Sequence, residues 1–192
     1  MHIYETLPLA STGLVMGLVL FLLHFIALLR PTATRALLTQ ASDAPLAGTV
    51  LLGIDFVWVA LLLYDAEWNP LCMPLFQFEG FRHILLILCP VLWFILSSMA
   101  KENLFPRALG MFLLLMALVP MSAAFLKDPL SRILIPIWWY PVLTAAMFWV
   151  AKPYLFRDWM AKLTARPLLL GTINVLGAAY GIAIITCAIT LW

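Results

Sequence analysis

Charge is scarce in this sequence. Charged residues make up 10% of the 192 residues, whereas hydrophobic residues make up 65%, and the mean hydropathy is +1.06. A soluble domain is usually about half apolar and about a quarter charged. The composition therefore excludes an ordinary soluble domain and predicts a chain whose surface largely faces lipid.

Motifs that carry chemistry are also missing. The sequence contains no CxxC pair, no Cys/His cluster of zinc spacing, no HExxH motif, no nucleophile elbow and no glycine-rich phosphate loop. It has no basic patch typical of nucleic-acid binding. His24 and His83 are expected at different membrane depths, which argues against a haem held between them. We therefore expect no metal, no cofactor and no nucleic-acid partner.

Cysteines number three, Cys72, Cys89 and Cys187, and all are expected in the outer half of the molecule or outside it. A Cys72–Cys187 disulfide would need an oxidising outer compartment. Free thiols are the favoured interpretation.

Long apolar runs dominate what is present. A helix needs about 20 apolar residues to span the hydrocarbon core, and backbone groups in lipid must be satisfied within the segment. No stretch between the runs is long enough for a soluble domain. We therefore predict a single transmembrane domain over 1–192, an all-α bundle of about six spanning helices. The predicted spans are 12–29, 47–64, 83–99, 108–126, 133–151 and 167–191.

The distribution of Lys and Arg predicts the orientation, because cytoplasmic loops of membrane proteins are enriched in these residues. Both termini are then expected outside, in a bacterial inner membrane or an equivalent membrane. Three basic residues fall on the predicted outside: Arg82, Lys127 and Arg132. Eight fall on the predicted inside: Arg30, Arg35, Lys101, Arg107, Lys152, Arg157, Lys162 and Arg166.

The segment 152–166 is predicted to be a basic interfacial helix. Phe156 and Met160 recur at helical spacing, whereas Arg157 and Lys162 fall on the other side. Such a segment lies in the headgroup region and favours anionic lipid. An ordinary interfacial connector is the favoured interpretation, with a dedicated lipid or partner site as the alternative.

Four polar residues from four predicted helices share one depth. Each lies roughly 9 to 12 Å from the inner end of its helix, at about 1.5 Å per residue. His24 and Asp55 could then pair, with two further residues completing the hydrogen bonds. Ionisable groups in membranes are costly and often functional, yet interhelical contact by polar groups is the simpler interpretation. The four residues are His24, Asp55, Thr144 and Asn174.

Two GxxxG patterns predict close helix packing. Gly13 and Gly17 lie in the first span, and Gly177 and Gly181 lie in the last. Small residues let helices approach closely, within one chain or between subunits. A faint repeat with a period of 51 residues, such as Pro90-Val91-Leu92 and Pro141-Val142-Leu143, is left open as either a duplication or a coincidence of membrane composition.

Two classes of function follow. The first is a non-enzymatic membrane component, such as an accessory or assembly subunit of a larger complex, with membrane lipids and other membrane subunits or further copies of itself as partners. The second is a small transporter or channel, with proton coupling through His24 and Asp55. A membrane-embedded enzyme ranks third, because Glu79, Arg82 and His83 at the outer edge are too sparse to specify a reaction.

Overall fold

The computed structural model describes residues 3–41, 44–99 and 103–192, and every regular element in these ranges is a helix. This confirms the predicted all-α class. The elements are, in chain order, η1 (Ile3–Thr6), α1 (Leu9–Leu29), α2 (Pro31–Ala41), α3 (Pro45–Leu63), η2 (Phe76–Phe81), α4 (Arg82–Met99), α5 (Leu104–Ala124), η3 (Leu130–Ile133), α6 (Leu134–Ala151), α7 (Tyr154–Ala165) and α8 (Pro167–Thr190).

Six of these helices are long and apolar enough to cross a membrane. They are α1, α3, α4, α5, α6 and α8, so each predicted span corresponds to one helix. Proline occupies the first position of both α3 and α8, where its missing N–H needs no partner and its fixed φ suits a helix start. Helix α3 therefore begins at Pro45, two residues before the predicted start, and α8 begins at Pro167, as predicted.

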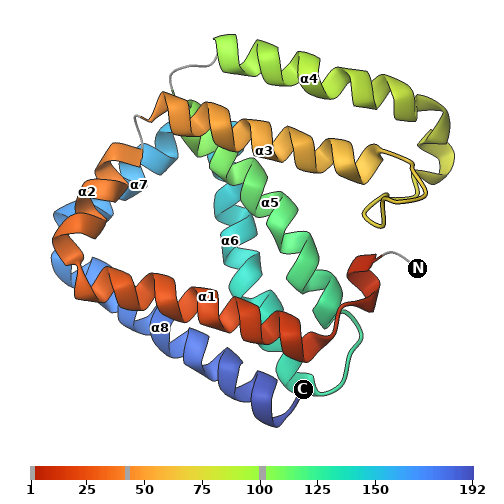
Figure 1. Cartoon of the computed structure of the whole chain (residues 1–192). Coiled ribbons are helices and arrows are strands. Elements are labelled where there is room, and N and C mark those ends of the chain that lie inside the picture. Colours follow the sequence, from red (N-terminus) through yellow and green to blue (C-terminus); the bar gives the residue numbers. More distant parts are fainter. Residues whose placement is uncertain (1–2, 42–43, 100–102) are drawn as a thin grey trace.

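Helix α5 connects the two halves of the bundle (Figure 1). On one side it packs against α3, where the buried residues Leu52, Leu104 and Ala108 form a cluster. On the other side it packs against α6 and the start of α1, where Ala117 and Ile135 belong to a second buried cluster. The α3–α4 hairpin and the α1–α8 pair therefore lie on different sides of α5.

Helices α1 and α8 form the most extensive helix pair (Figure 1). They run antiparallel, because Gly13 near the start of α1 faces Trp192 beyond the end of α8, whereas His24 faces Gly177. At the centre, a Cβ on Gly181 would lie 2.7 Å from the backbone nitrogen of Phe21. The two backbones are thus in direct contact.

Two short helices, α2 and α7, pack against each other at one end of the molecule (Figure 1). At about 1.5 Å per residue neither is long enough to span a membrane. Helix α7 corresponds to the predicted interfacial segment. It anchors itself by Phe156, which is buried and makes edge-to-face contacts with Phe105 of α5 and Trp149 of α6. Helix α2 was not predicted.

Candidate functional site

The four polar residues predicted to share one depth are distributed over two interfaces and the outer surface. His24 and Asn174 lie in the α1–α8 interface, because Asn174 is buried one turn from Gly177, against which the His24 ring packs. Asp55 is buried on the face of α3 that also carries Leu52. Thr144 is exposed on α6.

His24 is held by α1, α6 and α8 together. Its Nδ1 lies 2.8 Å from the carbonyl oxygen of Leu20 in the preceding turn, and because a carbonyl only accepts, Nδ1 carries the proton in this bond. The imidazole meets the ring of Trp138 edge to face at 5.8 Å between centroids. Trp138 in turn stacks on Tyr180, whose hydroxyl donates to the carbonyl oxygen of Leu134 at 2.7 Å. This arrangement ties three helices together.

Asp55 is completely buried, with 0% of its surface exposed. Neither carboxyl oxygen has a hydrogen-bond partner within the described residues. Its neighbours one turn away belong to the apolar cluster around Leu52 and Ala108. A carboxyl group in such a position carries an unrecovered desolvation cost, which makes Asp55 the chemically most unusual group in the bundle.

The proposed pairing of His24 with Asp55 is absent from the structure. Asp55 forms neither an ion pair nor a hydrogen bond with any described residue. The physical reason is the choice of helix neighbours: α1 packs along α8, whereas α3 packs along α5. Equal depth along the helix axes therefore does not bring these two side chains together.

Thr144 completes no interhelical hydrogen bond either. Its hydroxyl donates to the carbonyl oxygen of Tyr140, 2.8 Å away in the same helix. Such a bond to the preceding turn satisfies a threonine hydroxyl locally. Asn174 likewise forms no side-chain hydrogen bond with the residues that the structure describes, although it is buried beside α1.

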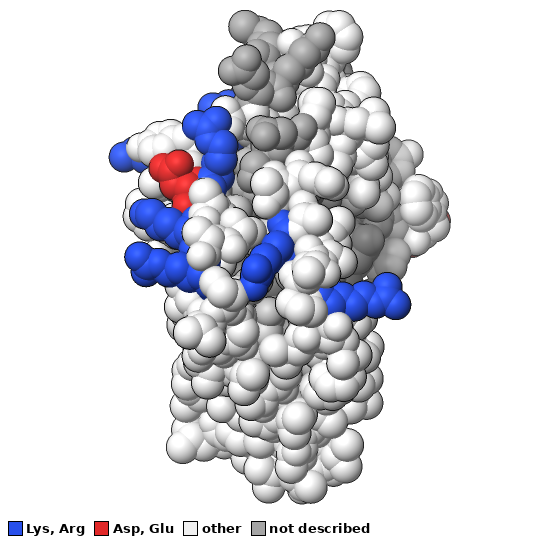
Figure 2. Space-filling model, turned by 90° about the vertical axis from the view of Figure 1, so that its left-hand side faces the viewer, with Lys and Arg blue, Asp and Glu red and all other residues white. Residues whose placement is uncertain are grey.

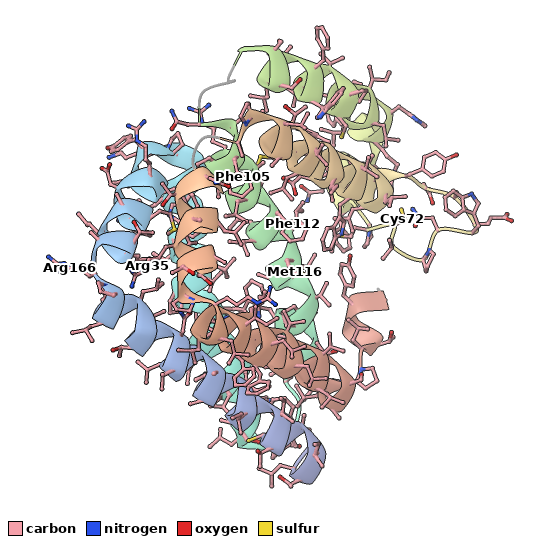
Figure 3. All side chains as sticks on the ribbon, turned by 60° about the vertical axis from the view of Figure 1, so that its left-hand side comes forward. Arg35, Cys72, Phe105, Phe112, Met116 and Arg166 are labelled. Carbon is pink, nitrogen blue, oxygen red and sulfur yellow. The ribbon has the colours of Figure 1, made fainter. Side chains whose placement is uncertain are left out.

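Several polar contacts at the C-terminal end of α3 were not predicted. Arg82 is 6% exposed and donates to Glu79 at 2.6 Å, to the carbonyl oxygen of Leu63 at 2.7 Å and to Cys72 Sγ at 2.9 Å. The charge pair at 79 and 82 was visible in the sequence, but its backbone partner was not. Arg82, one of the few charged residues predicted at this edge, therefore holds the 64–81 segment against the end of α3. Cys72 of this segment is labelled beside α3 in Figure 3.

All three cysteines are free. Cys72 engages Arg82, whereas Cys187 lies in α8, so the favoured interpretation of free thiols agrees with the structure and the disulfide is not formed. A cavity lined by Met121, Ser122, Phe125 and Lys127 lies at the C-terminal end of α5. It includes none of the four predicted polar residues.

The class of protein that the fold indicates is an all-α membrane protein with six candidate spanning helices. No protein-family model matches the chain, and neither a curated protein nor a solved structure is detectably similar to it.

Proposed function

We propose that the chain is a non-enzymatic integral membrane component, an accessory or assembly subunit of a larger membrane complex. The observation that carries the proposal is the position of α4. This helix packs on α3 and on its own preceding turn η2, and it lies at the edge of the molecule away from the other spanning helices (Figure 1). Its outer face is apolar, with Ile87 68% and Phe94 67% exposed.

Within its own chain, α4 is packed on one side only. A second membrane protein would pack against its other side. Helices in lipid associate through close packing and interhelical hydrogen bonds rather than through the hydrophobic effect. The hydrogen bond that Trp93 of α4 donates to α3 is long, with 3.4 Å between Trp93 Nε1 and the carbonyl oxygen of Thr49, and therefore weak. The apolar faces of α1 and α8 are also exposed, and lipid alone can cover such faces. The test therefore compares a substitution on α4 with one on α8.

The test is native mass spectrometry after mild detergent extraction from the protein's own membrane. Ile87→Trp places a larger side chain on α4, and Leu176→Trp is the matched control on α8, where the side chain is 64% exposed. We expect the wild type to extract in a fixed ratio with another subunit, Ile87→Trp to lose most of that association, and Leu176→Trp to retain it. A lone chain, or equal loss in both variants, would contradict the proposal.

The second candidate function is a small transporter or channel with proton coupling. Its specific support is Asp55, which is fully buried in α3 and finds no hydrogen-bond partner for either carboxyl oxygen in the described part of the chain. Carboxyl groups inside membranes recur in proton relays. Since His24 lies in a different interface, this candidate rests on Asp55 alone.

Proton flux in liposomes tests this candidate. We expect Asp55→Asn to lower the rate at which a pH gradient decays by at least about tenfold, because an amide cannot exchange a proton as a carboxyl does. Asp65→Asn is the control, since Asp65 is exposed beyond the end of α3. Wild-type liposomes without flux above empty liposomes, or equal flux in the two variants, would exclude proton transport through Asp55.

A further inference from the structure

The α2–α7 end of the molecule concentrates positive charge. Figure 2 faces this end and shows lysine and arginine side chains gathered over it, with an uncharged surface below. Asp158 is the one acidic side chain among the described residues of this end. Seven described basic side chains lie at the same end: Arg30, Arg35, Arg107, Lys152, Arg157, Lys162 and Arg166.

None of these seven side chains forms an ion pair within the described part of the chain. Basic loops that merely set orientation need nothing more than exposure to water. Arg35 and Arg107 differ, because both side chains are partly buried and the Nε of each is buried with no hydrogen-bond partner among the described residues. A buried donor left unsatisfied is costly, and more so on a charged group.

The two arginines come from different elements, α2 and α5, and both elements contact α7. Arg35 lies in the middle of α2, and Figure 3 shows it on the side of the molecule where Arg166 marks the junction of α7 and α8. Arg107 lies in the first turns of α5, next to Phe105, which packs on α7. Neither arginine forms an ion pair with a carboxylate of the described residues, so we take an anion from outside the chain as the partner of each.

The position of this end selects the kind of anion. Here α1 and α6 end and α5 and α8 begin, which is the depth of lipid headgroups for helices that span the hydrocarbon core. Helix α7 buries Phe156 and Met160 against the bundle and leaves Arg157 and Lys162 exposed. Guanidinium groups suit phosphate oxygens through paired N–H donors, whereas lysine adds a point charge.

We propose that the α2–α7 end binds the phosphate groups of anionic phospholipids, with Arg35 and Arg107 as direct ligands. The exposed basic residues, including Arg157 and Lys162, raise the local concentration of anionic lipid without forming the site. This inference does not depend on the function proposed above.

The experiment measures lipid binding to the purified full chain in detergent by native mass spectrometry. The probes are phosphatidylglycerol, phosphatidylcholine and inorganic phosphate. We expect phosphatidylglycerol to bind at least about tenfold more tightly than phosphatidylcholine, because the choline cation of phosphatidylcholine offsets the charge of its phosphate group and is repelled by the basic side chains of this end. Inorganic phosphate at millimolar concentration should not displace the lipid. Equal binding of the two lipids, or full displacement by phosphate, would overturn the proposal.

A pair of double variants separates a built site from a diffuse basic surface. Arg35→Gln with Arg107→Gln and Arg157→Gln with Lys162→Gln remove the same charge from the same end. We expect the first pair to lose the preference for phosphatidylglycerol and the second to weaken binding by no more than about threefold, because exposed charges are screened. Equal loss in both would overturn the site.

A charge-conserving variant serves as a control for loss of folding in the Arg35→Gln with Arg107→Gln variant. Arg35→Lys with Arg107→Lys keeps the charge but loses the paired donors, and should bind phosphatidylglycerol more weakly than wild type by several-fold. Wild-type affinity in this variant, with its thermal unfolding unchanged, would show that charge alone suffices and would refute the role of the two arginines as direct ligands.

Discussion

At the scale of single residues, Arg82 fixes the segment between α3 and α4. Besides Glu79, Leu63 and Cys72, its guanidinium donates to the carbonyl oxygen of Met73 at 3.2 Å. Asn69 supports the same segment through a bond of 2.7 Å to the carbonyl oxygen of Leu61. The segment is therefore held from within, although it lies outside the regular helices.

We expect Arg82→Met to release this segment. The variant removes the donors to two backbone carbonyls, and hydrogen bonds from charged groups are each worth roughly 1.5–3 kcal/mol. Hydrogen exchange should show faster exchange at amides of 64–81 and unchanged exchange in α1. The control is Glu79→Gln, whose smaller effect follows from the 48% exposure of the Glu79 side chain. Unchanged exchange in Arg82→Met would show that Arg82 does not hold the segment.

The residue scale also shows what the sequence could and could not predict. The depth of His24 and Asp55 along their helices follows from counting residues, at about 1.5 Å each. The rotation of each helix about its axis does not, because α1 and α3 are apolar almost all round and no amphipathic stripe marks the inward face. Partners of buried polar groups therefore could not be assigned in advance.

At the scale of elements, close glycine contacts determine how the helices pair. The two GxxxG patterns were visible in the sequence, and the structure brings Gly17 of the first against Gly181 of the second, with a Cβ on Gly181 lying 2.9 Å from the carbonyl oxygen of Gly17. Gly48 and Gly110 form similar contacts, with Phe105 and with Ala146, without any GxxxG pattern to mark them. Apolar length predicts the spanning helices, whereas the choice of partner helix depends on contacts that spacing alone does not encode.

Gly181→Ala should therefore destabilise the α1–α8 pair. The added methyl group would meet backbone atoms of α1, which cannot move aside as a side chain can. We expect the free energy of unfolding in detergent to fall by about 1–3 kcal/mol, the usual cost of overpacking. Gly171→Ala in the same helix is the matched control, because no atom lies within 4 Å of its added Cβ.

Alanine at the control position should be neutral or stabilising by up to about 1 kcal/mol, since alanine favours helix more than glycine does. The two variants differ in their contacts but share the helix and the substitution. If both changed stability equally, the tight backbone approach at Gly181 would be refuted and helix propensity alone would account for the result.

Helix α2 shows a further limit at this scale. The sequence 31–41 follows a spanning helix and contains Thr, Gln and Arg among its apolar residues, so it fails any search for a spanning run. Its helical form is supported by Pro31 at the first position and by packing against α7. Because α7 is more than 100 residues later in the sequence, this support becomes visible only in the folded chain.

At the scale of the whole molecule, the two ends differ in charge. The α2–α7 end carries seven described basic side chains, whereas the opposite end carries Arg82, Lys127 and Arg132. Of these three, Arg82 is engaged by Glu79 and Arg132 donates to the carbonyl oxygen of Lys127. Among the described residues, seven basic side chains without an ion pair thus lie at the α2–α7 end and two, Lys127 and Arg132, at the opposite end. This bias predicts that the α2–α7 end faces the cytoplasm.

Labelling of single cysteines with a membrane-impermeant maleimide tests this orientation in intact cells. The background carries Cys72→Ser, Cys89→Ala and Cys187→Ala, since serine can still accept the hydrogen bond from Arg82.

Gln77→Cys and Lys162→Cys then report the two ends, because both positions are exposed. Gln77 lies at the start of the apolar stretch Phe76–Ser98, and Lys162 lies in the short helix α7. We expect Gln77→Cys to react in intact cells and Lys162→Cys to react only after permeabilisation. The reverse pattern would place the basic end outside, where the positive-inside rule could no longer account for it and binding of anionic lipid would remain as the reason for its charge.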